Sequence, residues 1–412
     1  MTTTAEQMGF DPDRLVRLDS WMERYVAERK FPGSALLIRR GGEEVYFNAT
    51  GLRNIEEGLP WERDTVARIY SMTKPITSVA IMMLVERGLF HLDTPVSEFI
   101  PSFKDMTALV EGATHIGQTV SAPSPTVHHL LTHTSGLSYP FNPGVLPKAM
   151  EEAKIMFRAD DSSLAEMVDR AAALPLAFQP GKHWEYSISI DILGRIVEVV
   201  SGQPLDVFFK ENIFAPIGMS ETAFRVPEGT GDRFAALYTP LAGDAMDLNA
   251  AKEGGDSLRL VDRPGKSIFE RTTCFSGGGG PVNNKADYML FTEMLRRGGD
   301  VPGGRLLSPK TLSFMMRNHL PGDIASMGPR SFAEQPMDGM GFGLGGSVVL
   351  DPGRVRVPGS VGDFSWGGMA STMFWVDPVL DLSVVFFTQL SPSSSYPARP
   401  ELKALVHGAI VA

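Results

Sequence analysis

The sequence is poor in the residues that mark several common classes of protein. One cysteine, Cys274, among 412 residues excludes a framework of internal disulfides and any zinc site built from several cysteines. No apolar run approaches the ~18 residues that a membrane-spanning helix needs. Basic residues are outnumbered, because 38 Lys and Arg stand against 48 Asp and Glu and give a net charge of −10. Nucleic acid and anionic membrane surfaces are therefore not expected as partners.

The remaining composition is that of a globular protein. Hydrophobic residues make up 43% of the chain, and a chain of this length buries enough surface to need no covalent staple. Residues 1–15 lack the basic segment and the apolar run of a signal peptide. We therefore expect a cytoplasmic protein, and the sequence leaves its oligomeric state open.

Hydrophobic periodicity predicts strands near both ends of the chain and helices between them. We expect strands at 34–38, 44–48, 345–350, 369–376 and 382–389, and helices at 11–28, 71–87, 189–201, 284–297 and 401–411. Residues 230–272 are polar and poorly periodic, which indicates a long surface excursion. This order predicts an α+β fold with one sheet assembled from N- and C-terminal segments. It divides the chain into an α/β domain of residues 1–95 and 230–412 and a mainly helical inserted domain of residues 96–229.

The first candidate for chemistry is the pair Ser71 and Lys74, which are three residues apart at the start of a predicted helix. Residues at this spacing share a helix face, so the hydroxyl and the amine can meet. Pro75 is tolerated only in the first turn, which places Ser71 at or next to the helix N-terminus. There a buried lysine can take the serine proton. The alternative is a capping serine followed by a surface lysine.

Two further segments carry candidate groups. Tyr186 precedes the helix at 189–201 and could act as a general acid or base, or simply pack against Trp184. Trp366-Gly367-Gly368 precedes a predicted strand, where paired glycines let a ligand approach the backbone or merely form a turn. A backbone N–H there could join that of Ser71 in an oxyanion hole.

These three segments, in this order, resemble the serine β-lactamase and penicillin-binding-protein superfamily, and most closely the family VIII carboxylesterases, which are similar to class C β-lactamases. The runs Tyr70–Pro75, His129–Leu137 and Ser276–Gly280 match as well, and the resemblance extends from about residue 10 to 410. It implies a β-lactamase-like fold with the active site between the two domains. It also implies that Ser71, Lys74 and Tyr186 are catalytic and that the N–H groups of Ser71 and Met369 hold the oxyanion.

Two departures from the β-lactamase pattern bear on specificity. Ile188 stands where those enzymes usually have the asparagine of Tyr-x-Asn, and Trp366 stands where they have the lysine of Lys-Thr-Gly. A site that has an indole in place of a cation should prefer neutral, apolar esters to anionic lactams or peptides. The expected activity is therefore that of a carboxylesterase for short to medium acyl chains, acting through an acyl-serine intermediate.

Other activities stay open at this point. The acyl group could pass to an alcohol, as in an acyltransferase, and β-lactamase or D-alanyl carboxypeptidase activity is possible in this superfamily. A non-catalytic binder is a weaker alternative. Candidate pocket residues are Tyr139, Phe141 and Phe364 besides Trp366, Gly367 and Gly368. No cofactor or metal is expected, the partner is a small-molecule ester, and whether Lys74 or Tyr186 is the base is not decided by the sequence.

Overall fold

The computed structural model describes residues 4–156, 162–248, 258–333 and 335–412. Its main sheet has eight strands, all paired antiparallel, in the order β14-β15-β16-β17-β18-β1-β2-β3. These strands are β1 (Gly33–Arg40), β2 (Glu43–Asn54), β3 (Leu59–Pro60), β14 (Met340–Phe342), β15 (Ser347–Val349), β16 (Phe364–Gly367), β17 (Met373–Asp377) and β18 (Leu382–Thr388).

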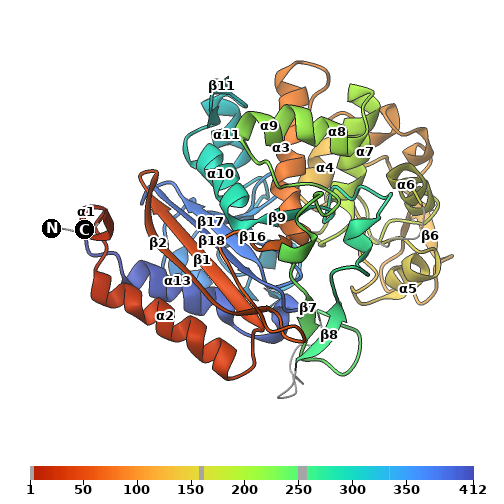
Figure 1. The fold of residues 1–412 in the computed structure, drawn as a ribbon. Helices are drawn as coiled ribbons and strands as arrows, with labels where there is room; N and C mark the ends of the chain where they lie inside the picture. Colours follow the sequence, from red (N-terminus) through yellow and green to blue (C-terminus); the bar gives the residue numbers. More distant parts are fainter. Residues whose placement is uncertain (1–3, 157–161, 249–257, 334) are drawn as a thin grey trace.

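The first long strand and the last lie side by side at the centre of this sheet. Ser34 of β1 pairs with Thr388 of β18, and the ladder runs without interruption to the pair Arg40 and Leu382. The red and blue strands of Figure 1 show this mixture of chain ends directly. The predicted α+β fold, with one sheet built from N- and C-terminal segments, is therefore confirmed.

Helices cover both faces of the sheet and form a separate group beside it (Figure 1). They are α1 (Thr4–Gln7), α2 (Pro12–Ala27), α3 (Thr73–Glu86), α4 (Val127–Leu131), α5 (Val145–Glu152), α6 (Leu164–Ala172), α7 (Ser189–Ser201), α8 (Leu205–Phe209), α9 (Ala215–Ile217), α10 (Lys285–Arg296), α11 (Pro309–Met315), α12 (Pro352–Val355) and α13 (Ala398–Gly408). The short strand pairs are β4 (Val66–Arg68) with β9 (Val282–Asn284), β5 (Thr107–Leu109) with β6 (Thr119–Ser121), β7 (Leu237–Thr239) with β8 (Arg259–Asp262), β10 (Asp300–Val301) with β11 (Gly304–Arg305), and β12 (Ser331–Phe332) with β13 (Gln335–Pro336).

Each face of the sheet has its own apolar core. The helices α2 and α13 pack on one face, around side chains such as Trp21, Phe386 and Leu402. The other face shares a larger core with α3, α7 and α10. Because this larger core runs without a break from the sheet into the helices of residues 96–229, the structure draws no boundary there, and the two-domain division stays a prediction.

The helix α3 lies at the centre of the molecule, and its sequence explains why. Nearly all of its side chains are buried, from Thr73 to Leu84, and a helix that is apolar all round belongs inside a core. The predicted helix over 71–87 divides at its start, because Tyr70–Met72 forms a 3₁₀ turn and the α-helix begins at Thr73. Pro75 then lies in the first turn, where its missing N–H costs no hydrogen bond.

Other boundaries also differ from the predictions. The strand expected from residue 369 begins at Met373, since Met369–Thr372 forms a turn. The predicted surface excursion contains the β7–β8 pair, and its residues 249–257 lie outside the described part of the chain. Among the described residues, no helix combines the length and the apolar character that crossing a membrane demands.

Candidate active site

Ser71 lies in the 3₁₀ turn that leads into α3, at the wall of a pocket. The turn has an unusual backbone, because Tyr70 has a φ of +43°, and a non-glycine residue in that region is strained. The ring of Tyr70 packs edge-on against Phe269 at 5.6 Å between centroids. This packing supports the strained turn that presents the Ser71 hydroxyl.

Lys74 is fully buried and directs its ammonium at three oxygen atoms. Its Nζ lies 3.2 Å from Ser71 Oγ, 3.0 Å from the Tyr139 hydroxyl and 2.8 Å from the carbonyl oxygen of Gly278. The pairing of Ser71 with Lys74 expected from their spacing is therefore present in the structure. The contacts with Tyr139 and Gly278 could not be read from local sequence, because these residues lie far along the chain.

Tyr186 approaches the same serine from the segment before α7. Its hydroxyl and Ser71 Oγ share a hydrogen bond of 2.5 Å, and Lys74 Nζ lies 4.6 Å from the centre of its ring. The packing against Trp184 considered for this tyrosine is present too, at 6.4 Å between stacked rings. Tyr186 thus combines a packed ring with a hydroxyl placed on Ser71.

The ring of Tyr186 rests against His133, which lies in the segment that follows α4. The ring centroids are 4.9 Å apart, and the next residue, Ser187, donates its N–H to His133 Nδ1 at 3.2 Å. Burial lowers the pKa of His133 well below its usual value, and the charge of Lys74 adds to this. A neutral His133 therefore helps fix the backbone that carries Tyr186.

The loop after β16 packs against the turn that carries Ser71. A side chain at Gly368 would collide with the carbonyl oxygen of Ile69, two residues before Ser71. Gly368 therefore lets this loop pack directly on the turn that carries the serine. Within the described residues, the backbone N–H groups of Ser71 and Met369 donate to no protein acceptor, as the donors of an oxyanion hole would.

The pocket in front of Ser71 has a volume of about 780 Å³. Its wall is largely aromatic and sulfur-rich, with acidic residues among the remainder; the lining includes Tyr139, Phe141, Met156, Tyr186, Met246, Phe269, Phe332, Met337, Met340, Trp366, Glu151, Asp244 and Asp247. Tyr139 stacks on Phe141 at 4.7 Å between ring centroids. Of the predicted pocket residues, Tyr139, Phe141, Trp366, Gly367 and Gly368 line this cavity.

The prediction that Phe364 lines the pocket is wrong. Phe364 is fully buried in the core under the sheet, 6.2 Å from the ring of Phe374, and does not line the pocket. It lies two residues before Trp366 on β16, so both side chains leave the same face of the strand. Phe364 extends into the interior, and a side chain at Gly346 would strike its ring.

A cation that was not predicted from the sequence lies beside the glycine pair. Arg399 of α13 lines the pocket, and its guanidinium lies where a side chain on Gly367 would have to be. The expectation that no cation is near Trp366 was based on the residues next to it in the chain. Arg399 is brought there by the fold, and no local signal indicated it.

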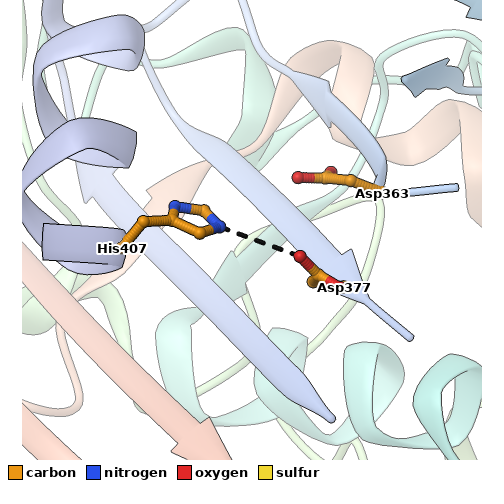
Figure 2. Close-up of side chains that lie close together, drawn as sticks. All are labelled: Asp363, Asp377 and His407. Atoms are coloured by element: carbon orange, nitrogen blue, oxygen red, sulfur yellow. Dashed lines mark ion pairs between the residues drawn. The ribbon is translucent and has the colours of Figure 1, made fainter. Parts of the chain in front are cut away.

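One group of His and Asp side chains is close enough to share a metal ion, but it lies away from Ser71. Figure 2 shows Asp363, Asp377 and His407 facing one another where α13 meets the sheet, with His407 Nε2 3.8 Å from Asp377 Oδ2. Lys403 Nζ lies 2.7 Å from Asp363 Oδ2. Because Lys403 already supplies a positive charge, we interpret the group as an ion-pair network. The absence of a metal stays a prediction.

Comparisons with known proteins give one consistent family. A family model described as Beta-lactamase matches residues 18–408. The chain is 34% identical to Esterase EstB of Burkholderia gladioli over 90% of this chain and 89% of that protein. It is 27% identical to monacolin J acid methylbutanoyltransferase of Aspergillus terreus over 96% and 95% of the two chains. A solved structure of "EstCE1, a hydrolase with promiscuous acyltransferase activity" superposes with a TM-score of 0.80 at 26% identity, covering all of both chains.

Proposed function

The chain belongs to the beta-lactamase family, and from this premise we propose that it is a serine esterase that hydrolyses small-molecule esters of short to medium acyl chains. One observation carries the proposal: Ser71 Oγ is contacted by both Lys74 Nζ and the Tyr186 hydroxyl, at 3.2 and 2.5 Å. A serine held by two groups that can move its proton is an activated nucleophile. The similarity to Esterase EstB supports this choice within the family.

The reaction follows from the positions of these groups. Ser71 Oγ attacks the ester carbonyl while its proton passes to the Lys74–Tyr186 pair, and the N–H groups of Ser71 and Met369 stabilise the oxyanion. The pair returns the proton to the leaving alcohol, which leaves an acyl group on Ser71. Water then attacks this acyl-enzyme by the same route, so ping-pong kinetics are expected.

The pocket favours neutral esters. The indole of Trp366 and the ring of Phe332 stack at 6.1 Å between centroids and form an apolar wall beside the serine, which suits uncharged acyl and alcohol groups. Arg399 is the exception, because it supplies a positive charge at the Gly367 end of the pocket. A direct comparison of the two substrate classes is therefore the test of the preference for esters over anionic β-lactams.

Acyl transfer to an alcohol is the second candidate function. A cavity of about 780 Å³ lies well within the range of sites that hold drug-sized ligands, so an acceptor alcohol can bind next to the acylated serine. The relatives named for acyltransferase activity support the same possibility. Added alcohols should then give ester product at the expense of free acid.

The first experiment compares p-nitrophenyl acetate, butyrate and octanoate with the β-lactam nitrocefin. We expect rapid release from the shorter esters and little nitrocefin turnover. Ser71→Ala should reduce ester hydrolysis below about 1% of wild type, while Ser313→Ala, on the exposed side of α11, should leave it unchanged. Faster turnover of nitrocefin would contradict the ester preference. An active Ser71→Ala variant would remove Ser71 as nucleophile.

The cytoplasm is our proposal for the location of the protein, and it rests on the sequence alone. The site residues and the mainly helical domain of residues 96–229 are likewise proposals. The contacts that surround Ser71 support the first, and the grouping of α4 to α9 beside the sheet in Figure 1 supports the second.

A further inference from the structure

A buried carboxylate lies behind the catalytic lysine, and the mechanism above does not use it. Asp191 is in the first turn of α7 and is only 3% exposed. No ion pair of Asp191 occurs among the described residues. Its Oδ1 accepts hydrogen bonds from the Ser276 hydroxyl and from the backbone N–H of Gly278, the latter at 3.1 Å. Removing a carboxylate from water is costly unless it is hydrogen-bonded and paired with a counter-charge.

Gly278 connects this carboxylate to Lys74. Its N–H donates to Asp191, and its carbonyl oxygen accepts from Lys74 Nζ at 2.8 Å. A side chain at this position would lie 2.5 Å from Asp191 Oδ2 and 3.2 Å from the Tyr139 hydroxyl. Only glycine therefore fits between the two charged groups, and the carboxylate holds the N–H side of the residue whose carbonyl oxygen the lysine binds.

The charges of the two groups act on each other. Burial raises the pKa of Asp191, and the positive charge of Lys74 and the hydrogen bond from Ser276 oppose this rise. The pKa of Tyr139 is raised well above its usual value by burial, by Tyr186 and by the charge of Asp191. The titratable groups that face Lys74 are thus Tyr139, Tyr186, His133 and Asp191, and of these only Asp191 is an acid of low intrinsic pKa.

We propose that Asp191 is the counter-charge of Lys74 and the residue that positions Gly278 for it, so that Lys74 stays an ammonium and Tyr186 receives the Ser71 proton. An ammonium has three donors and no lone pair. Its three donors have acceptors in Ser71, Tyr139 and Gly278. The other group in contact with Ser71 Oγ is the Tyr186 oxygen.

The proton balance is then simple. In the reactive form Lys74 is positive and Tyr186 is a phenolate. As the bond from Ser71 Oγ to the acyl carbon forms, the serine proton moves to the Tyr186 oxygen. As the bond from that carbon to the alcohol oxygen breaks, Tyr186 returns the proton to the departing alcohol. Lys74 keeps its protons throughout, and Asp191 is a positioning residue that touches no substrate atom.

This inference rests on the proposed acyl-serine function, and its test keeps the two apart. The experiment measures kcat/KM for p-nitrophenyl butyrate against pH for wild type, Asp191→Asn and Ser276→Ala. Asn preserves the shape and one acceptor but removes the charge. Ser276→Ala removes one hydrogen bond to the same carboxylate and keeps the charge. If Asp191→Asn does not fold, as judged by circular dichroism, Asp191→Ser removes the charge with a smaller side chain.

A negative charge makes it harder for the Lys74–Tyr186 pair to lose its first proton. In Asp191→Asn the acid limb of the profile should therefore move to lower pH, by about one unit, while the plateau falls about tenfold because the remaining proton leaves Lys74 more often. The acid limb of the Ser276→Ala profile should lie at the same pH as that of wild type. If the acid limb of Asp191→Asn does not move, Asp191 is not the counter-charge of Lys74. If the limb moves but the plateau is undiminished, Lys74 and not Tyr186 is the base. A wild-type enzyme inactive on every ester would instead refute the esterase.

Discussion

At the scale of single residues, Lys74 is the side chain on which the site depends most. It is buried with three oxygen partners, and one of them, the Tyr139 hydroxyl, comes from a segment that no motif assigns to catalysis. Tyr139 also stacks on Phe141, so the same side chain forms pocket wall on one side and orients the lysine on the other.

Tyr139→Phe should therefore reduce kcat more than it changes KM. It keeps the ring and removes one acceptor of a charged donor, a loss of about 1.5–3 kcal/mol, which corresponds to roughly a 10- to 100-fold lower kcat/KM. Steady-state kinetics with p-nitrophenyl butyrate measure this. Tyr25→Phe is the control, since it also removes a buried hydroxyl hydrogen bond, to Glu401, on the other face of the sheet. A change confined to KM would mean that Tyr139 only shapes the pocket.

The sequence predicted the residues that a short motif holds together and missed those that only the fold brings near. Ser71 and Lys74 meet because residues three apart share a helix face. Asp191 lies five residues after Tyr186, and an acid between two isoleucines in the first turn of the helix was a usable signal in the sequence. Arg399 and Gly278 carried no comparable signal, because their partners are far away in the chain.

At the scale of elements, the turn before α3 and the loop after β16 form one unit. The close approach of Gly368 to Ile69 joins them, and the N–H of Gly368 donates to the carbonyl of Thr372 to close the loop. The positions of the two candidate oxyanion donors are thus set by backbone packing.

Gly368→Ala should consequently impair catalysis more than stability. The added methyl group has to displace the loop from Ile69, and losing one aligned oxyanion donor costs about 10²–10³ in kcat. Gly231→Ala is the control, because a methyl group there meets open space. The measurements are kcat and the thermal unfolding midpoint. An unchanged kcat in a folded Gly368→Ala variant would exclude Met369 from the oxyanion hole.

Element types were easier to predict than their limits. Alternating apolar residues indicated the strands, but the start of β17 depends on the Met369–Thr372 turn, whose geometry is set by packing on Ile69. Likewise, helix propensity cannot distinguish a 3₁₀ turn at Tyr70–Met72 from the first turn of α3, since Tyr70 adopts its strained backbone under tertiary packing.

At the scale of the whole molecule, α13 is fixed to the sheet by contacts with two buried carboxylates, Asp363 and Asp377 (Figure 2). The side chain of Asp363 is completely buried and that of Lys403 is 12% exposed. Lys403→Met should lower the free energy of unfolding by about 3–5 kcal/mol, because it leaves an uncompensated buried carboxylate. The double variant Lys403→Met/Asp363→Asn should recover part of this loss. Denaturant unfolding measures both effects.

The control is the exposed pair of Arg305 and Asp300, where Arg305→Ala should cost at most about 1 kcal/mol. Equal effects of Lys403→Met and Arg305→Ala would show that burial adds nothing to the first pair. A metal-dependent unfolding midpoint in the wild type, abolished by chelator, would contradict our interpretation of the cluster as an ion-pair network.

The pairing of β1 with β18 has a consequence for synthesis. Thr388 donates its hydroxyl hydrogen bond to Gly33, 355 positions earlier in the chain. At the usual ~5–20 residues per second, a ribosome needs on the order of 20–70 s after it has made β1 to reach β18. Until then the edge of β1 that pairs with β18 keeps its backbone N–H and C=O groups unpaired, so the central sheet forms after translation is nearly complete. Chaperone occupancy during elongation is therefore expected to persist until β18 emerges.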